Sequence, residues 1–272
     1  MDILVIASLV GLGAVAGFAA GLLGIGGGML LVPFLTMLLP LAGVPESVII
    51  HAAIATSMAT IVFTSMSSLR AHHKRGAILW HIVAVMGPGL VLGGILSGGA
   101  IFSYLSGAWL SLVFGVFVAY SAVKMLWGKA PPASNAMPGK VATAGAGVGI
   151  GFMSGLVGAG GGFLSVPFMV RGNVPMHNAV ATSAALGFFI AIANSVGYIS
   201  SGFQETSHYN GMIGYIFWPA LLAVSGMSVL TAPFGARCAH ALPVKSLKKV
   251  FACLLFSLAA YMLHEAYLAF SI

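Results

Sequence analysis

The sequence predicts an all-α integral membrane protein with ten membrane segments, arranged as two inverted repeats of five. Three observations support this fold class: the composition, the number of long apolar runs, and an internal duplication. Hydrophobic residues make up 60% of the 272 residues and charged residues only 6%, whereas a soluble domain carries about 25% charged residues. So little polar material cannot cover a soluble globule, but a surface that faces lipid needs no polar cover.

The apolar runs define the expected segments. A hydrocarbon core about 30 Å thick is crossed by about 20 helical residues. Eight runs approach that length, at residues 3–23, 48–69, 77–102, 107–127, 141–157, 177–203, 211–234 and 250–272. Two shorter runs, 28–42 and 162–170, each follow a glycine cluster. Because no basic region precedes residues 3–23, we expect this run to be a span and not a cleaved signal.

The charged residues indicate that the two short runs also cross. With eight spans the eleven basic residues divide almost evenly between the two sides of the membrane. With ten spans they all lie on one side, and the four acidic residues lie on the other, at Asp2, Glu46, Glu205 and Glu265. The positive-inside rule therefore favours ten spans with both termini outside. A short run can still cross as a broken helix, because extended chain covers about 3.3 Å per residue.

An internal duplication relates the two halves. A shift of 134 residues aligns 11–34 with 145–168, and fourteen of the 24 positions are identical. We therefore divide the chain into a first repeat (1–128), a cytoplasmic linker (129–140) and a second repeat (141–272). Since each repeat has an odd number of spans, the second must be inverted relative to the first, as in many secondary transporters.

Glycines recur every four residues before each cluster. Gly13, Gly17 and Gly21 form one stripe, and the second repeat has the same stripe. Small residues at this spacing let two membrane helices approach closely. We assign these stripes to helix packing and not to a substrate site.

The glycine clusters are the first candidate site. A glycine break inside a membrane leaves backbone N–H groups without helical partners, and a half-helix that begins there directs its positive end toward the midplane. Two such ends can bind an anion without Arg or Lys. The alternative is a tight turn between packed helices. The candidate residues are Gly26, Gly27, Gly28, Gly160, Gly161 and Gly162.

Hydroxyl side chains supply further candidates. A shift of 126 residues pairs His51, Thr56 and Ser57 with equivalent residues of the second repeat. The hydroxyls of Thr56, Ser57, Thr182 and Ser183 can donate to an oxyanion, or they can bond back to the preceding helical turn.

Two histidines and one asparagine are candidates for coupling. His51 and His177 are expected at opposite membrane faces, where titration could couple proton movement to anion transport; the alternative is ordinary packing. Asn194 has Ser68 at its equivalent position. It either breaks the symmetry of the site or bridges two helices.

Other functional classes lack their sequence signatures. We find no His-Glu-x-x-His, no paired membrane aspartates and no Walker sequence, so we expect neither an enzyme nor a metal site or cofactor. The basic residues do not form one soluble face, which excludes a nucleic-acid partner. Cys238 and Cys253 are poorly placed to pair.

The chain resembles the TauE/SafE family of proposed sulfite and sulfonate exporters. The resemblance covers nearly the whole length and begins with the two glycine clusters. The other matching segments are Ala55-Thr-Ser57, His73-Lys-Arg-Gly76, the helix with Gly87 and Gly93, Ile213-Gly-Tyr-Ile-Phe-Trp-Pro219, Gly235-Ala-Arg237, and Leu242-Pro-Val-Lys-Ser-Leu247 followed by Phe251.

This resemblance implies a secondary transporter that exports small anions by alternating access, with organic sulfonates, sulfite or related sulfur compounds as the leading substrates. A passive anion channel and a non-transporting membrane sensor or partner protein are the alternatives. We expect a multi-pass protein of the inner or plasma membrane whose partners are the bilayer and a small anion. A homodimer is one assembly that the sequence allows.

Overall fold

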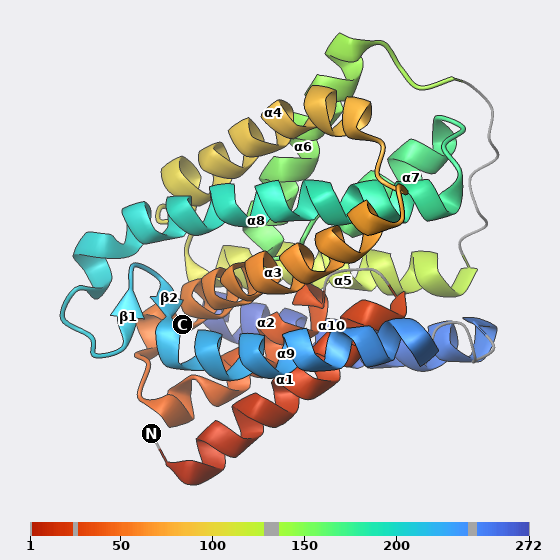
Figure 1. Cartoon of the computed structure of the whole chain (residues 1–272). Coiled ribbons are helices and arrows are strands. Elements are labelled where there is room, and N and C mark those ends of the chain that lie inside the picture. Colours follow the sequence, from red (N-terminus) through yellow and green to blue (C-terminus); the bar gives the residue numbers. More distant parts are fainter. Residues whose placement is uncertain (1, 24–26, 128–135, 239–243, 272) are drawn as a thin grey trace.

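The computed structural model describes residues 2–23, 27–127, 136–238 and 244–271. These residues form ten α-helices and one short β-hairpin (Figure 1). The α-helices are α1 (Ile3–Leu23), α2 (Gly28–Leu38), α3 (Ile49–Lys74), α4 (Trp80–Ile95), α5 (Gly107–Trp127), α6 (Lys140–Val157), α7 (Gly162–Arg171), α8 (Met176–Thr206), α9 (Trp218–Cys238) and α10 (Val244–Ser271). Two 3₁₀ turns, η1 (Pro40–Ala42) and η2 (Glu46–Val48), precede α3, and a π-helical turn, η3 (Leu96–Ile101), continues α4.

Eight of the described helices are long and apolar enough to cross a membrane. The helices α2 and α7 have 11 and 10 residues, which corresponds to about 15 Å each at 1.5 Å per residue. The all-helical membrane architecture is therefore confirmed. The ten crossings, the inversion and the division into repeats stay predictions.

The observed helices follow the expected segments closely, with one error. Residues 3–23 and 107–127 are helical over their full predicted lengths. The prediction was wrong for residues 211–217, which were expected at the start of a helix. They form strands β1 (Met212–Ile213) and β2 (Ile216–Phe217), which pair antiparallel. Gly211 and Gly214 have positive φ angles of 87° and 54°, a backbone region that suits a tight turn and not a helix.

Helices of the two halves pack on one another. The most extensive helix pairs are α1 with α9, α5 with α10, α4 with α6, and α3 with α8. Each of these pairs joins one helix from residues 1–127 to one from residues 140–271. In the centre of the molecule, α3 and α8 lie side by side and run in opposite directions (Figure 1). The halves are thus intertwined and share one core.

The glycine stripes make two of these pairs possible. A Cβ added at Gly13 of α1 would lie 2.6 Å from the carbonyl oxygen of Val224 on α9. A Cβ at Gly147 of α6 would lie 2.5 Å from the carbonyl oxygen of Met86 on α4. Neither helix could approach its partner so closely with a larger residue. The predicted packing role of the stripes is confirmed.

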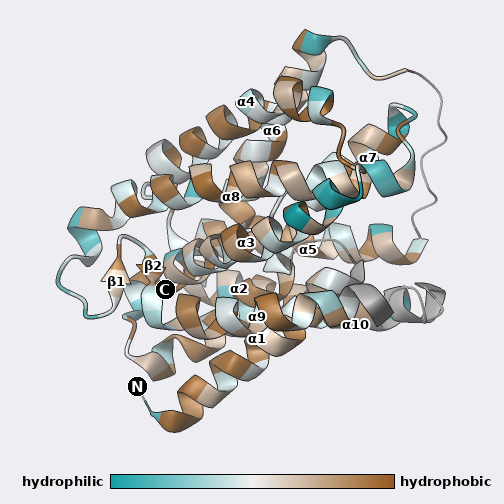
Figure 2. Cartoon of the chain, viewed as in Figure 1, coloured by the Kyte–Doolittle hydropathy of each residue, from teal (hydrophilic) through white to brown (hydrophobic). Residues whose placement is uncertain are grey.

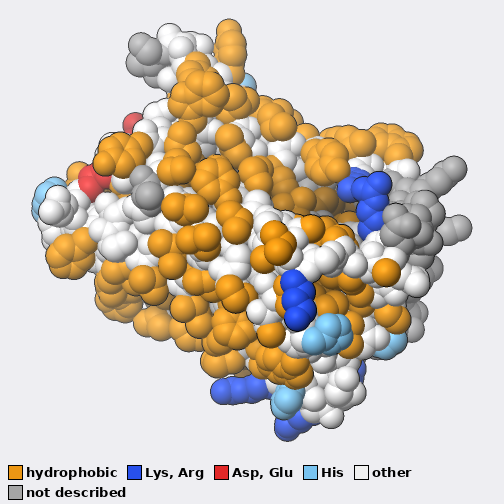
Figure 3. Space-filling model, turned by 90° about the horizontal axis from the view of Figure 1, so that it is seen from above, with side chains coloured by type: hydrophobic (Ala, Val, Ile, Leu, Met, Phe, Trp, Pro, Cys, Tyr) orange, Lys and Arg blue, Asp and Glu red, His pale blue; other side chains and the backbone are white. Residues whose placement is uncertain are grey.

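The surface has the polarity of a membrane protein. Hydrophobic residues cover the sides of the helices, and hydrophilic residues gather at helix ends and connections (Figure 2). Large apolar side chains such as Leu4, Trp127 and Val141 are exposed. In Figure 3 the acidic side chains lie at the upper left, and the Lys and Arg side chains lie to the right and below. The Lys and Arg residues whose side chains are described are all exposed: Arg70, Lys74, Arg75, Lys124, Lys140, Arg171 and Lys249.

Candidate functional site

The short helices α2 and α7 begin at equivalent glycines. Gly27 precedes α2 with φ 68°, and Gly161 precedes α7 with φ 69°. Glycine adopts this left-handed conformation without strain, whereas other residues do not. The repeat therefore conserves the same backbone break in both halves of the chain. Gly26 lies outside the described residues.

Both breaks lie against the preceding long helix. A Cβ on Gly27 would lie 3.1 Å from the Ala16 carbonyl oxygen and 3.3 Å from the Ala20 Cβ of α1. A Cβ on Gly161 would lie 3.1 Å from Ser154 Oγ and 3.5 Å from the Ile150 Cγ2 of α6. The shift of 134 residues maps Ala16 to Ile150 and Ala20 to Ser154, so the two breaks have matching surroundings.

The two glycine clusters meet inside the molecule. A Cβ on Gly28 would overlap the Gly158 carbonyl oxygen and would lie 3.2 Å from Ala159 Cα. Ser57 of α3 donates a hydrogen bond to the same Gly158 oxygen at 3.2 Å. Ile61, one turn further along α3, would lie 3.0 Å from a Cβ on Gly28 and 3.1 Å from one on Gly160. The clusters are therefore in contact, and α3 covers their junction.

The electrostatics of the junction come from the backbone. The first helical hydrogen bonds of α7 run from Leu164 and Ser165 to the Gly161 oxygen, and those of α2 run from Leu30 and Leu31 to the Gly27 oxygen. The N–H groups that precede these donors have no acceptor within their helices. They are at Gly28, Met29, Gly162 and Phe163. The N-termini of α2 and α7 thus place positive electrostatic potential beside the buried residues of the junction.

The serine and threonine candidates separate into two kinds. Ser57 lies at the cluster junction, and Ser183 of α8 shares a 2.8 Å hydrogen bond with Ser165 of α7. Thr56 and Thr182 face other elements: their hydroxyl oxygens accept the backbone N–H groups of Phe217 and Leu79, both at 3.0 Å. These N–H groups lie immediately before α9 and α4. The threonines hold the starts of those helices and are not directed at the glycines.

The two histidines have different surroundings. His51 is buried, and its Nε2 lies 3.2 Å from the Phe102 carbonyl oxygen and 3.0 Å from that of Leu105. Because both neighbours are acceptors, Nε2 carries the proton. Its ring stacks on Tyr215 with centroids 4.9 Å apart. His177, at the equivalent position of the repeat, is exposed.

Tyr215 links His51 to an acidic residue. The Tyr215 hydroxyl donates a hydrogen bond to the Glu205 carboxylate. Burial, followed by this hydrogen bond and the nearby negative charge, raises the pKa of Tyr215 above its usual value of 10. The phenol therefore stays protonated, and remains a donor to Glu205, throughout the neutral range.

Asn194 bridges helices. It is fully buried; its Nδ2 donates to the Ile190 oxygen at 3.0 Å, and its Oδ1 accepts from Ser97 of η3 at 3.2 Å. This geometry corresponds to the bridging alternative. Within the described ranges, no group of three or more His, Cys, Asp and Glu residues could hold a metal ion.

Two residues near the second cluster were missed by the sequence interpretation. Ser154 and Ser165 lie beside the start of α7, where the first repeat has Ala20 and Leu31. The signal was available in the alignment of the two repeats, as positions where a hydroxyl replaces an apolar side chain.

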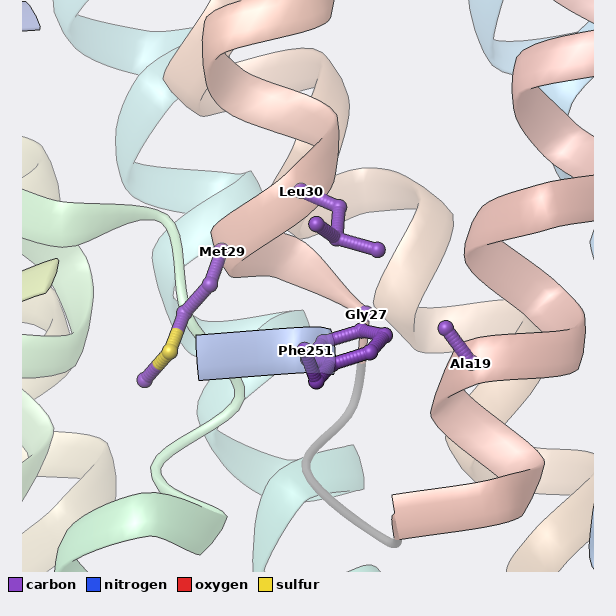
Figure 4. Close-up of a pocket in the computed structure, with 5 residues that line it drawn as sticks. All are labelled: Ala19, Gly27, Met29, Leu30 and Phe251. Carbon is purple, nitrogen blue, oxygen red and sulfur yellow. The ribbon is translucent and has the colours of Figure 1, made fainter. Parts of the chain in front are cut away.

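A small pocket beside Gly27 is apolar. It is lined by Ala19, Gly27, Met29, Leu30 and Phe251 (Figure 4). Its side chains offer no polar group to an anion, so the pocket lies next to the cluster junction without supplying a binding site itself.

Comparison with known proteins agrees with this architecture. The sequence model described as Sulfite exporter TauE/SafE matches residues 9–262. The chain belongs to the TauE/SafE family. A "Probable membrane transporter protein" of Haemophilus influenzae is 36% identical over 251 residues, which cover 92% of this chain and 95% of the relative. No solved structure matches the chain.

More distant TauE/SafE relatives have the same description. A "Probable membrane transporter protein" of Methanocaldococcus jannaschii is 26% identical over 265 residues and covers 96% of both chains. One from Bacillus subtilis is 34% identical over 220 residues, with 71% of this chain and 78% of the relative covered. The chain is therefore a multi-pass membrane protein of a transporter family.

Proposed function

We propose that this TauE/SafE chain is a secondary transporter that exports small anions by alternating access. Organic sulfonates, sulfite or related sulfur-containing anions are the proposed substrates. The family description supports sulfite as the reference substrate, and the names of the relatives support transport. A transporter of this kind needs no catalytic residues, and we propose none.

The meeting of the two glycine clusters is the observation that carries this proposal. Gly28 and Gly158 approach closely enough to exclude any side chain. Two helix N-termini supply N–H groups there that have no acceptor within their helices, and the described Lys and Arg side chains are all exposed. An anion is the ligand that backbone donors and helix dipoles favour.

We place the substrate at this junction, between residues 26–28 and 160–162, with Ser57 and Ser183 as flanking hydroxyls. Thr56 and Thr182 support the site indirectly, since their oxygens already accept backbone N–H groups from the segments before α9 and α4. Residues 160–162 are buried, so alternating access requires these packed elements to move apart.

We also propose ten membrane segments in two inverted repeats, with both termini outside. Crossing by α2 and α7 places every basic residue on one side, and the separated charges in Figure 3 support this arrangement. The repeats then correspond to residues 1–128 and 141–272.

Proton coupling is assigned to the histidine pair, with His51 as the principal residue. His51 is buried against Tyr215, which donates a hydrogen bond to Glu205, and the His51 Nδ1 has no hydrogen-bond partner in the described part of the chain. His177 is exposed at the other end. His51→Gln should flatten the pH dependence of uptake more strongly than His177→Gln does.

Counterflow in proteoliposomes tests the proposed function. Vesicles preloaded with unlabelled sulfite should accumulate external labelled sulfite faster than empty vesicles, with saturable rates and competition from methanesulfonate. A channel would give flux without saturation or stimulation by internal sulfite. Absence of flux for all these anions would contradict transport and favour a sensor or partner role.

A further inference from the structure

The two glycine clusters differ in polarity although their backbones match. Ser154 stands beside Gly161 where Ala20 stands beside Gly27. Ser165, in the first turn of α7, replaces Leu31 of α2. The second cluster therefore has hydroxyl groups at two positions where the first has only carbon.

Ser154 is the more unusual of these serines. Its exposed fraction is 3%, and its Oγ has no hydrogen-bond partner among the described residues. Serines inside membrane helices commonly donate to the carbonyl of the preceding turn, as Ser121 does to Phe117 at 2.7 Å. A buried hydroxyl without a partner is unfavourable, so an acceptor is expected at this position.

The unpartnered hydroxyl lies at the start of α7. Ser154 Oγ is 3.1 Å from the site of a Cβ on Gly161, the residue that immediately precedes Gly162 and Phe163, whose N–H groups have no acceptor within α7. A buried side-chain donor thus lies beside a helix start whose first two backbone N–H groups have no acceptor within the helix. The Ser165 and Ser183 hydroxyls share one hydrogen bond between them, which leaves one of their two protons for another acceptor.

We propose that Ser154 is a substrate-binding residue that donates its hydroxyl proton to the oxyanion group of the substrate at the start of α7. This inference rests on the proposed transport function and adds an asymmetry to it. The second cluster binds the charged head group, and the first cluster faces the remainder of the substrate.

The asymmetry defines the substrate class further. Beside the first cluster lie Ala20 and the apolar pocket with Phe251. Apolar surroundings disfavour a second charge. The substrate is therefore an anion with a single oxyanion head, such as sulfite or a short alkylsulfonate, and not a molecule with a charged group at each end.

Ser154→Ala tests the proposal in the purified full-length protein. Dissociation constants for sulfite and methanesulfonate, measured by ligand-induced thermal shift, should rise about tenfold or more, as expected for a lost hydrogen bond to a charged group. The Tm of the ligand-free variant should stay the same or rise, because a hydroxyl without a protein partner is removed. Ser154→Cys, which keeps the shape but donates weakly, should show the same loss.

Ser121→Ala is the matched control. It removes a buried helical hydroxyl that has an intrahelical partner, so it should leave both dissociation constants unchanged.

The wild-type protein should also bind methanesulfonate, which has one charged group, more tightly than ethane-1,2-disulfonate, which has two.

Three outcomes would overturn the proposal. Dissociation constants of Ser154→Ala within about twofold of wild type would show that the hydroxyl does not contact substrate, while the transport proposal would stand. A fall in ligand-free Tm that accounts for the lost binding would assign Ser154 to packing. If wild-type protein bound none of these anions, the transport proposal would fail together with this one.

Discussion

The direction of each side chain determines which residues of α3 face the proposed site. Thr56 and Ser57 are neighbours in sequence, but a helix turns by about 100° between them. Ser57 therefore reaches the Gly158 oxygen at the cluster junction, and Thr56 accepts the Phe217 N–H before α9. The equivalent Thr182 does the same for Leu79 before α4. In this motif the threonine therefore stabilises the packing of a neighbouring helix, and the adjacent Ser57 lies at the proposed site.

The two glycines that begin the short helices should be sensitive to a methyl group. Gly27→Ala and Gly161→Ala should each lower the free energy of unfolding by about 1 kcal/mol, because both have positive φ. Both should also weaken anion binding in protein that remains folded, which thermal-shift titration with sulfite would measure. Gly161→Ala should be the more severe, since its Cβ would lie 2.5 Å from Ile190 Cδ1.

Gly43→Ala is the control for this pair. Gly43 has φ 86°, but an added Cβ would meet nothing within 4 Å. The variant should show the same backbone strain with unchanged binding. Equal binding by all three variants would argue that the glycines only permit a turn.

The threonine contacts predict a loss of stability without a loss of affinity. Thr56→Val and Thr182→Val remove the acceptors for buried backbone N–H groups, so each should cost about 1–3 kcal/mol in unfolding free energy. Thr60→Val is the comparison, because Thr60 Oγ1 bonds only back to Thr56 in its own helix. Denaturant titration in detergent would measure the difference. A selective loss of sulfite affinity in the Thr56 variant would show that this hydroxyl contacts the substrate after all.

At the scale of elements, the fold depends on close approach between helices of opposite halves. The α4–α6 contact is lined by glycine on both sides: a Cβ at Gly93 of α4 would lie 2.8 Å from the Phe152 nitrogen, and Gly151 of α6 lies against Leu90. No side chain separates the two backbones at these points. In a membrane, such close contact replaces the hydrophobic effect as the source of helix association.

Two glycines of α6 provide a paired test of this contact. Gly151→Ala should destabilise the protein by about 1–3 kcal/mol, because the added methyl overlaps the backbone of Leu90. Gly149, two residues earlier on the exposed side of α6, has nothing within 4 Å of an added Cβ. Gly149→Ala should therefore be neutral or slightly stabilising through its higher helix propensity. The unfolding midpoints of both variants would test this packing role, and a similar loss of stability in both would contradict it.

At the scale of the whole molecule, the two halves are one structural unit. The first helix of each half packs on the fourth helix of the other, as α1 on α9 and α6 on α4. Movement of one half as an independent rigid body would break these contacts. The proposed alternating access is therefore a movement of packed helix pairs drawn from both halves.

Accessibility of single cysteines tests the ten-segment arrangement. In a background without Cys238 and Cys253, Ser47→Cys and Met176→Cys introduce thiols at exposed positions after α2 and after α7. If both short helices cross, an impermeant reagent added outside intact cells should label Ser47→Cys and not Met176→Cys. Equal labelling of the two would place them on one side and leave only the eight long spans.

The sequence by itself determined the class of the protein, most helix bounds and the location of the backbone breaks, because these follow from local properties. Apolar length specifies a span, and a glycine cluster specifies where a helix can stop. The family resemblance was also readable from these motifs. The exception at this level was the β-hairpin of residues 212–217, where two glycines with positive φ, Gly211 and Gly214, override an apolar run.

Only the tertiary structure decided which equivalent residues have equivalent surroundings. His51 is buried against two carbonyl groups while His177 is exposed, although repeat symmetry makes the two positions equivalent. Ser154 lies beside a helix start, and its hydroxyl has no partner among the described residues, whereas the equivalent position of the first repeat is Ala20. The direction of a side chain depends on how its helix is rotated against helices from the other half of the chain. That rotation results from many distant contacts at once, and no local pattern in the sequence encodes it.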